Sequence, residues 1–149
     1  MAESEIVVRT ATPGDLAFVS MDGRLSDAVV RRKVSDADVI VALHIREPVG
    51  YLRLEWLWST LPYIEMIWVL RSHRHAGVGR RLLTRAEDGL ARRGCATLFS
   101  SSQADEPEPQ AWHRQMGFEE CGWIAGVNEG GVGEVFFRKP IGATPDNAK

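Results

Sequence analysis

The sequence has little of what would place it in several large classes of protein. Its 149 residues include only two cysteines, Cys95 and Cys121, which are too few for a disulfide framework and lack the spacing of a metal site. Its 18 basic residues are outnumbered by 20 acidic ones, and the net charge of -2 offers no basic surface for nucleic acid. We therefore expect no metal and no nucleic-acid partner.

Long apolar runs are also missing. The longest, such as residues 39–45, are far shorter than the about 20 residues that a membrane-spanning helix needs. Residues 1–5 are partly acidic, which is not typical of a signal peptide. We therefore expect no membrane association and a cytoplasmic location.

What the sequence does contain is typical of one globular domain. Hydrophobic residues make up 44% and charged residues 26% of the chain, a balance that permits a core without suggesting a membrane protein. A chain of this length can bury about two-thirds of the surface that its unfolded form exposes. The prediction is a single domain over residues 1–149, with a core at about 5–138 and a flexible tail at 140–149.

The periodicity of apolar residues alternates between that of strands and that of helices. A turn is expected at residues 47–50 and a polar loop at 101–109. The order of elements predicts a mixed α/β sheet covered by helices. Strands are predicted at 6–8, 39–45, 51–58, 63–70, 96–100, 118–127 and 132–138, and helices at 12–19, 28–33, 77–93 and 109–116.

The segment from Val69 to Arg81 carries the strongest functional signal. It joins an apolar strand to the best predicted helix through a turn that contains two glycines. A helix start leaves N–H groups unpaired, and four arginines at its positive end are unfavourable unless an anion neutralises them. The pattern lacks the Gly-Lys-Ser/Thr of a P-loop and the third glycine of a dinucleotide-binding loop. It favours a phosphate or pyrophosphate site over a plain tight turn.

At this point the sequence resembles a known family. Arg74-x-x-Gly77-x-Gly79 after a strand is similar to the acetyl-CoA motif of the GCN5-related N-acetyltransferases (GNAT superfamily). Residues 111–118, ending in Gly117-Phe118, resemble the late helix of that family. The order of elements matches from about residue 5 to 138. The resemblance implies an acyl-CoA N-acyltransferase-like α+β fold, with a mostly antiparallel sheet of about seven strands and flanking helices.

The resemblance also implies an activity and a cosubstrate. The expected enzyme is an N-acetyltransferase that moves the acetyl group of acetyl-CoA to a primary amine of a small molecule or a peptide. In the family, the main chain at the end of the strand pairs with pantetheine, and the loop N–H groups hold the pyrophosphate. The positions that match are Ile67, Trp68, Val69, Arg74, His75, Ala76, Gly77, Val78, Gly79 and Arg80.

Two residues are candidates for catalysis. His113 occupies the position of the family's usual tyrosine, which protonates the leaving thiolate, although it could be only a polar residue on an exposed helix face. Glu65 is the lone charge in an apolar strand and could accept the proton of the amine, or it could pair with Arg53 instead. Alternation places Glu65 on the face of Ile67 and Val69. A further departure is Glu106, where the family often has an asparagine that contacts CoA.

Several alternatives stay open. Because no Ser-His-Asp or Cys-His arrangement can be read from the sequence, direct attack by the amine in a ternary complex is preferred over an acetyl-enzyme. A non-catalytic acyl-CoA-binding or sensor protein of the same fold, and a phosphate-binding module unrelated to CoA, are the other hypotheses. The sequence leaves the acceptor and the oligomeric state undecided, with a homodimer as one option.

Overall fold

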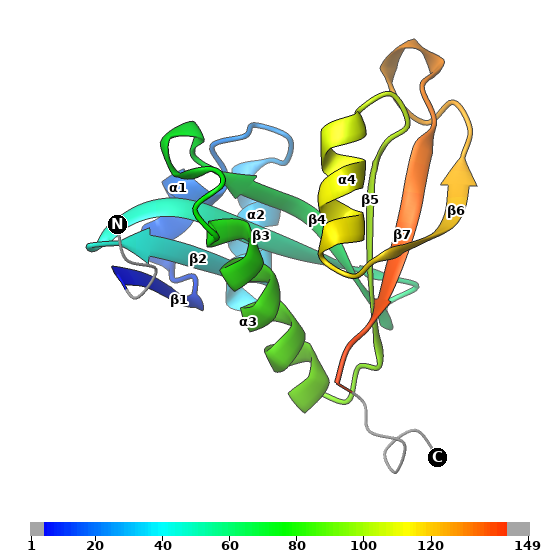
Figure 1. The fold of residues 1–149 in the computed structure, drawn as a ribbon. Coiled ribbons are helices and arrows are strands. Elements are labelled where there is room, and N and C mark those ends of the chain that lie inside the picture. Colours follow the sequence, from blue (N-terminus) through cyan, green and yellow to red (C-terminus); the bar gives the residue numbers. More distant parts are fainter. Residues whose placement is uncertain (1–4, 143–149) are drawn as a thin grey trace. The chain divides into compact units, whose positions relative to one another are not determined.

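The computed structural model describes residues 5–142 of the chain, and Figure 1 shows its helices and strands. They follow one another in the predicted order. They are β1 (Ile6–Thr10), α1 (Leu16–Val19), α2 (Asp27–Ser35), β2 (Val39–His44), β3 (Glu47–Leu57), β4 (Leu61–Val69), α3 (Val78–Arg92), β5 (Thr97–Gln103), α4 (Pro107–Gln115), β6 (Glu119–Ile124) and β7 (Glu134–Pro140).

The strands form a seven-stranded sheet in the order β1-β2-β3-β4-β5-β7-β6. β4 pairs with β5 in parallel, whereas β1 with β2, β2 with β3, β5 with β7 and β6 with β7 are antiparallel pairs. The predicted fold class, a mixed and mostly antiparallel sheet of about seven strands with flanking helices, is therefore confirmed.

Contacts divide the chain into two compact units. The first unit comprises Met1–Glu55 and Glu65–Gly89, and the second comprises Trp56–Ile64 and Leu90–Lys149. That residues 1–149 make a single domain stays a prediction.

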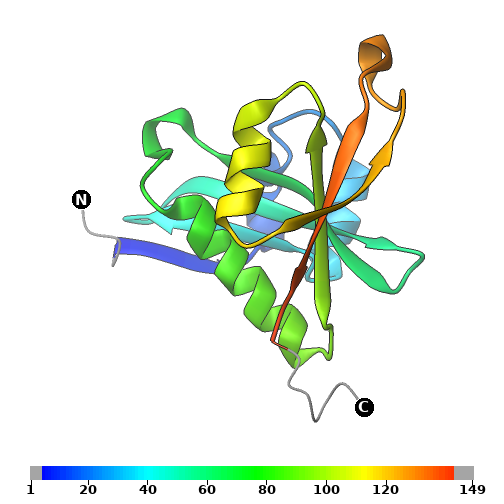
Figure 2. The same cartoon turned by 45° about the vertical axis from the view of Figure 1, so that its right-hand side comes forward.

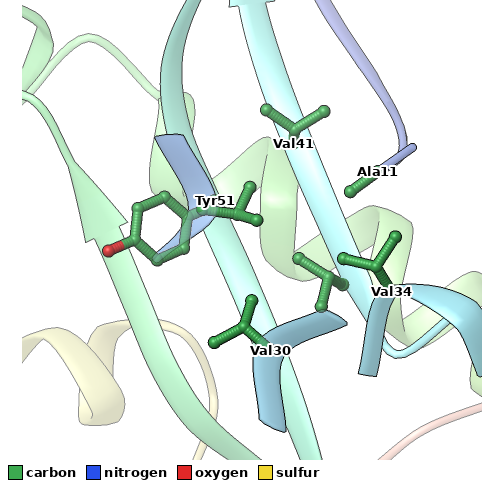
Figure 3. Packing of buried hydrophobic residues seen from close by; sticks show 7 residues of the cluster. Ala11, Val30, Val34, Val41 and Tyr51 are labelled. Carbon is green, nitrogen blue, oxygen red and sulfur yellow. The ribbon is translucent and has the colours of Figure 1, made fainter. Parts of the chain in front are cut away.

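The core of the first unit is a cluster of five valines, one alanine and one tyrosine, shown in Figure 3. Val30 and Val34 come from α2, Val41 from β2 and Tyr51 from β3, and each is 7% exposed or less. These side chains fill the space between the helices and the strands. Only the Tyr51 hydroxyl among them needs a hydrogen-bond partner. This packing fixes α2 on β2 and β3.

The stripe predicted for α3 is also buried. Val78, Leu82, Leu83 and Ala86 are each 5% exposed or less, at the spacing that places them on one face of a helix. The start of α3 is therefore held by packing as well as by its loop.

The predicted turn at residues 47–50 is wrong, because β3 already begins at Glu47. The chain reverses instead at Ile45 and Arg46, both of which have positive φ angles, of 47° and 69°. The register of β2 and β3 shifts where Leu43 faces Pro48. Proline is tolerated in a strand at such an irregularity, which explains why the Pro and Gly of this segment do not end the strand.

In the second unit, β5 pairs with β7 and β7 with β6, and α4 lies along β5 (Figure 2). β5 continues to Gln103, so the first residues of the predicted loop at 101–109 belong to the strand. β7 reaches Pro140, and the Ile141 N–H donates to the carbonyl of Ala96 at 2.9 Å. Of the predicted tail, residues 143–149 lie outside the described residues.

Within residues 5–142, no helix has both the length and the apolar character needed to cross a membrane.

Candidate functional site

The loop between β4 and α3 has the geometry that the sequence predicts. β4 ends at Val69, a 3-10 turn follows at Arg71–His73, and α3 begins at Val78. Just before the helix, His75 and Gly77 take positive φ angles of 64° and 85°. Gly77 adopts this left-handed backbone without strain, whereas a histidine rarely does. The chain thus turns sharply into α3.

The first turn of α3 presents unpaired donors. The first bond of the helical pattern runs from the Arg81 N–H to the carbonyl of Gly77 at 3.1 Å. The N–H groups of Val78, Gly79 and Arg80 therefore have no acceptor inside the helix. They add to the positive end of the dipole of a 15-residue helix, which favours an anion at this point.

The arginines around the loop divide into two groups. Arg71, Arg74 and Arg80 are exposed, and the Arg74 Nε donates to the carbonyl of Val69 at 3.0 Å. Arg81 instead reaches β1, where its Nη2 donates to the carbonyl of Ile6 at 2.8 Å. The expectation that all four arginines gather at the helix start is therefore wrong for Arg81.

Gly50 on β3 lies against both the main chain of β4 and the start of α3. A Cβ at this position would lie 2.9 Å from the carbonyl oxygen of Trp68, 3.2 Å from Val78 and 3.4 Å from Leu82. The contact with a backbone oxygen is too short to be relieved by rotating a side chain. Nothing in the sequence marks this role, because a glycine two residues after a proline is more typical of a turn.

The end of β4 does not alternate as expected. The Glu65 carboxylate bonds Arg53, and Trp68 stacks on Tyr51 with ring centroids 6.5 Å apart. Arg53 and Tyr51 share one face of β3, so Glu65 and Trp68 lie on the same side although three residues separate them. Strict alternation therefore does not hold between Glu65 and Trp68. That Glu65 shares the face of Ile67 stays a prediction.

Trp68 also has an unsatisfied donor. Its Nε1 is buried without an acceptor among the described residues. A buried N–H without a partner costs about 1–3 kcal/mol, and such groups are uncommon outside sites of strain or ligand binding.

Arg53 is fully buried and saturated by acceptors. Its Nε and Nη2 donate to the two oxygens of Glu65 at 2.7 and 3.0 Å, and Nη1 and Nη2 donate to the two oxygens of Asp22 at 2.6 and 2.9 Å. Nη1 also donates to the carbonyl of Val19 at 2.8 Å. All five N–H groups of the guanidinium are thus satisfied. The ion pair between Glu65 and Arg53, which the sequence offered as the alternative to a catalytic role for Glu65, is therefore present.

The Arg53 network alters the pKa values of Asp22 and Tyr51. Burial alone would raise the pKa of Asp22, but hydrogen bonds from Arg53 and Tyr51 lower it to about 2. Burial and the hydrogen bond to Asp22 raise the pKa of the Tyr51 hydroxyl, which donates to Asp22 at 2.6 Å. Asp22 is therefore a permanent anion over the physiological pH range. Nothing in its turn sequence marked it as a partner of Arg53.

His113 lies in the interior of the second unit and is only 4% exposed. Its Nδ1 lies 2.7 Å from the carbonyl of Pro109 and its Nε2 lies 2.7 Å from the Ser100 Oγ. A carbonyl only accepts, so Nδ1 carries the proton, and in the neutral ring Ser100 donates to Nε2. The imidazole stacks on Phe137 with centroids 4.7 Å apart. The alternative of an exposed polar residue is therefore wrong.

Burial is the main cause that lowers the pKa of His113, against an opposing contribution from the hydrogen bond to Pro109. The ring is accordingly neutral at pH 7. Ser100 is equally buried, at 2% exposed. The contact between Ser100 and His113 could not be predicted from the sequence. The two residues lie on different elements, β5 and α4, and only the fold brings them together.

A cavity of about 420 Å³ lies elsewhere in the second unit. It is lined by residues that include Trp56, Leu61, Arg93 and Cys95, and by none of the predicted site residues. It plays no part in the site proposed below.

The strand order and the flanking helices are those of the acyl-CoA N-acyltransferase type of fold. A sequence model of the acetyltransferase (GNAT) family matches residues 16–118, which is more than half of the chain. The chain belongs to this family. The prediction of an N-acetyltransferase enzyme is thereby confirmed.

Known relatives agree with this assignment. An aminoglycoside N(6')-acetyltransferase type 1 from Stenotrophomonas maltophilia is 27% identical and covers 95% of this chain and 97% of its own. The ribosomal-protein-S18-alanine N-acetyltransferase from Escherichia coli has the same fold, with a TM-score of 0.79 at 18% identity over 95% of this chain and 97% of its own. A chain of the NatC complex, solved with Gag peptide and CoA, matches with a TM-score of 0.78 at 17% identity over 92% and 99%.

Proposed function

We propose that this acetyltransferase transfers the acetyl group of acetyl-CoA to a primary amine by direct attack in a ternary complex. The observation that carries the proposal is the start of α3, where unpaired N–H groups, a positive dipole and exposed arginines converge. This arrangement fits a pyrophosphate, and family membership supports CoA as the molecule that bears it.

The CoA-binding residues follow from this arrangement. The N–H groups from His75 to Arg80 bind the pyrophosphate, and glycine at positions 77 and 79 keeps side chains away from it. Arg74, fixed to Val69 by its Nε, adds positive charge at the same end of the helix. The main chain of residues 67–69 at the end of β4 is proposed to pair with the amides of pantetheine.

The reaction breaks one bond and forms another. The lone pair of the neutral amine attacks the acetyl carbonyl carbon, the C–S bond breaks, and the products are an N-acetylated amine and CoA. The amine loses one proton and the thiolate of CoA gains one. Glu65 is the proposed acceptor of the first proton, since its carboxylate is mostly buried but stays 15% exposed while Arg53 holds it in place.

His113 is the proposed source of the proton for the thiolate. Its partner Ser100 offers a path, because a hydroxyl bonded to Nε2 can pass a proton on while it accepts one from the ring. Because the pKa of His113 is lowered, its protonated form is a stronger acid than an ordinary histidinium, but a smaller fraction of the protein carries it. His113 is thus suited to give up a proton but is seldom charged at pH 7.

The acceptor is proposed to be an amine on a small molecule, and aminoglycosides are the first class to test. The relative that spans almost the whole chain is named for the 6'-amine of such compounds. Peptide N-termini form the second class, because the structural relatives include a ribosomal-protein alanine acetyltransferase. The non-catalytic alternative is not favoured by membership of an acetyltransferase family.

The test is acetyl transfer from acetyl-CoA with a panel of amines. Release of the CoA thiol is followed by its reaction with a chromogenic disulfide, and mass spectrometry identifies the product as the amine plus one acetyl group. The proposal expects amine-dependent thiol release together with an acetylated product. Binding of CoA without transfer to any amine in the panel would return the chain to the non-catalytic hypothesis.

A further inference from the structure

Glu134 in the second unit is a carboxylate that forms no ion pair with any of residues 5–142, although its charge acts on His113 and opposes the lowering of that histidine's pKa. Its Oε2 accepts from the Ser101 Oγ at 2.5 Å and its Oε1 accepts from the Asn128 Nδ2 at 2.9 Å. Both donors are neutral. Among residues 5–142, no lysine, arginine or histidine lies within ion-pair distance of it. A half-buried charge in this state is poorly compensated, unlike Glu65 and Asp22.

The hydrogen bonds around Glu134 have a definite direction. Ser101 has one hydroxyl proton, and the carboxylate takes it. In the contact of 2.6 Å between Tyr63 and Ser101, the phenol must therefore be the donor. The hydroxyl protons of Tyr63 and Ser101 thus both point toward Glu134, and the negative charge of Glu134 polarises this chain of hydrogen bonds.

Two aromatic rings accompany this chain of hydrogen bonds. Tyr63 and Phe136 are stacked with ring centroids 5.9 Å apart. Phe136 follows Glu134 by two positions in β7, so the two side chains lie on one face of that strand, and Ser101 faces Phe136 in the register of β5 with β7. One face of the second unit therefore combines a carboxylate that forms no ion pair among the described residues with two stacked rings.

This combination suits an ammonium group. A carboxylate supplies the opposite charge, and aromatic faces attract a cation through their quadrupole. We infer that Glu134, Tyr63 and Phe136 bind a protonated amino group of the acceptor. The inference rests on the proposed function and extends it. The attacking amine must be neutral, so the ammonium held by Glu134 is a second one, and the preferred acceptor is a di- or polyamine.

The test compares two acceptors in the parent and in Glu134→Gln, which preserves shape and removes the charge. For kanamycin, which carries several ammonium groups, KM is expected to rise about 10- to 100-fold, the worth of one charged hydrogen bond. For benzylamine, which has a single amino group, and for acetyl-CoA, KM is expected to stay within about twofold. Glu119→Gln is the matched control: it removes an exposed carboxylate of the same unit and should leave all three values unchanged.

A KM for kanamycin that is equal in the parent and Glu134→Gln would overturn the inference, as would an equal rise for benzylamine. Tyr63→Phe is the second variant, because it retains the charge and ring but removes the phenol from the chain; a smaller rise for kanamycin alone is expected. If the parent acetylates no amine, the proposed function fails on its own. Titration calorimetry with kanamycin then decides: heat of binding lost in Glu134→Gln supports the ammonium site, and equal heats overturn it.

Discussion

Glu65 and Arg53 meet edge to edge, with both carboxylate oxygens accepting from the guanidinium at 2.7 and 3.0 Å. The other edge of Arg53 holds Asp22 in the same two-bond geometry. One buried cation therefore holds two carboxylates, of which only Glu65 has a proposed role in proton transfer. Asp22 serves as an internal control for that role.

Removing the charge of either carboxylate should destabilise the protein, but only one change should slow the reaction. Glu65→Gln and Asp22→Asn each leave Arg53 with one anion, at an expected cost of about 1–3 kcal/mol. Glu65→Gln should also lower kcat by about 10²–10⁴-fold, the usual worth of a positioned base. Denaturant unfolding and steady-state kinetics measure the two effects.

The comparison between the two variants decides the role of Glu65. The account expects Asp22→Asn to lose stability while its kcat stays near that of the parent. If Glu65→Gln loses only stability and keeps the kcat and pH profile of the parent, Glu65 is a structural ion pair.

Asp22 should make stability depend on pH in the acid range. Its pKa of about 2 in the folded protein lies below the ordinary value of 3.8, so its contribution is present above pH 5 and is lost as the pH falls toward 2. The shift corresponds to about 2 kcal/mol. The free energy of unfolding between pH 6 and 2 should therefore fall less steeply in Asp22→Asn than in the parent. Parallel curves would contradict this assignment.

Gly50 should control CoA binding without touching CoA. In Gly50→Ala the new methyl group meets the Trp68 carbonyl and pushes against Val78, which displaces the start of α3. We expect CoA affinity to fall at least 10-fold, with a lower melting temperature. Gly89→Ala is the control, because its methyl group enters open space in the same helix and should stabilise by about 0.5–1 kcal/mol. Unchanged CoA affinity in Gly50→Ala would remove Gly50 from the site.

Substitutions at His113 should separate proton donation from packing. His113→Phe retains an aromatic ring but deprives Ser100 and Pro109 of their partner, at about 1–3 kcal/mol of stability. If His113 supplies a proton, kcat should also fall about 10²–10⁴-fold, and His113→Tyr should recover much of it with its phenol. Equal kcat for all three proteins well below their melting temperatures would leave His113 a structural residue.

The order of elements and the sharp turn between β4 and α3 could be predicted because both depend on local signals. Apolar periodicity marks α3, and the two glycines with neighbouring arginines mark the start of the helix. Local signals gave the wrong prediction where tertiary packing determines the conformation of the backbone. Pro48 and Gly50 suggested a turn, but a register shift accommodates the proline, and the glycine admits α3.

The candidate catalytic residues show the same limit. Glu65 stood out because a lone charge in an apolar strand is unusual. Its position relative to Trp68 could not be predicted, because strict alternation does not hold between them. Ser100 and His113 are 13 positions apart on two different elements, and only the fold brings their side chains to 2.7 Å.

The central claim, that the start of α3 holds the pyrophosphate of CoA, is tested most directly by titration calorimetry with CoA. Gly79→Val places a branched side chain in the first turn of the helix, where the backbone has no positive φ to strain. Gly89→Val makes the same change near the far end of the helix, in open space. The account predicts that CoA affinity falls at least 10-fold in Gly79→Val and is unchanged in Gly89→Val. Equal affinity for CoA in the parent and both variants would contradict it.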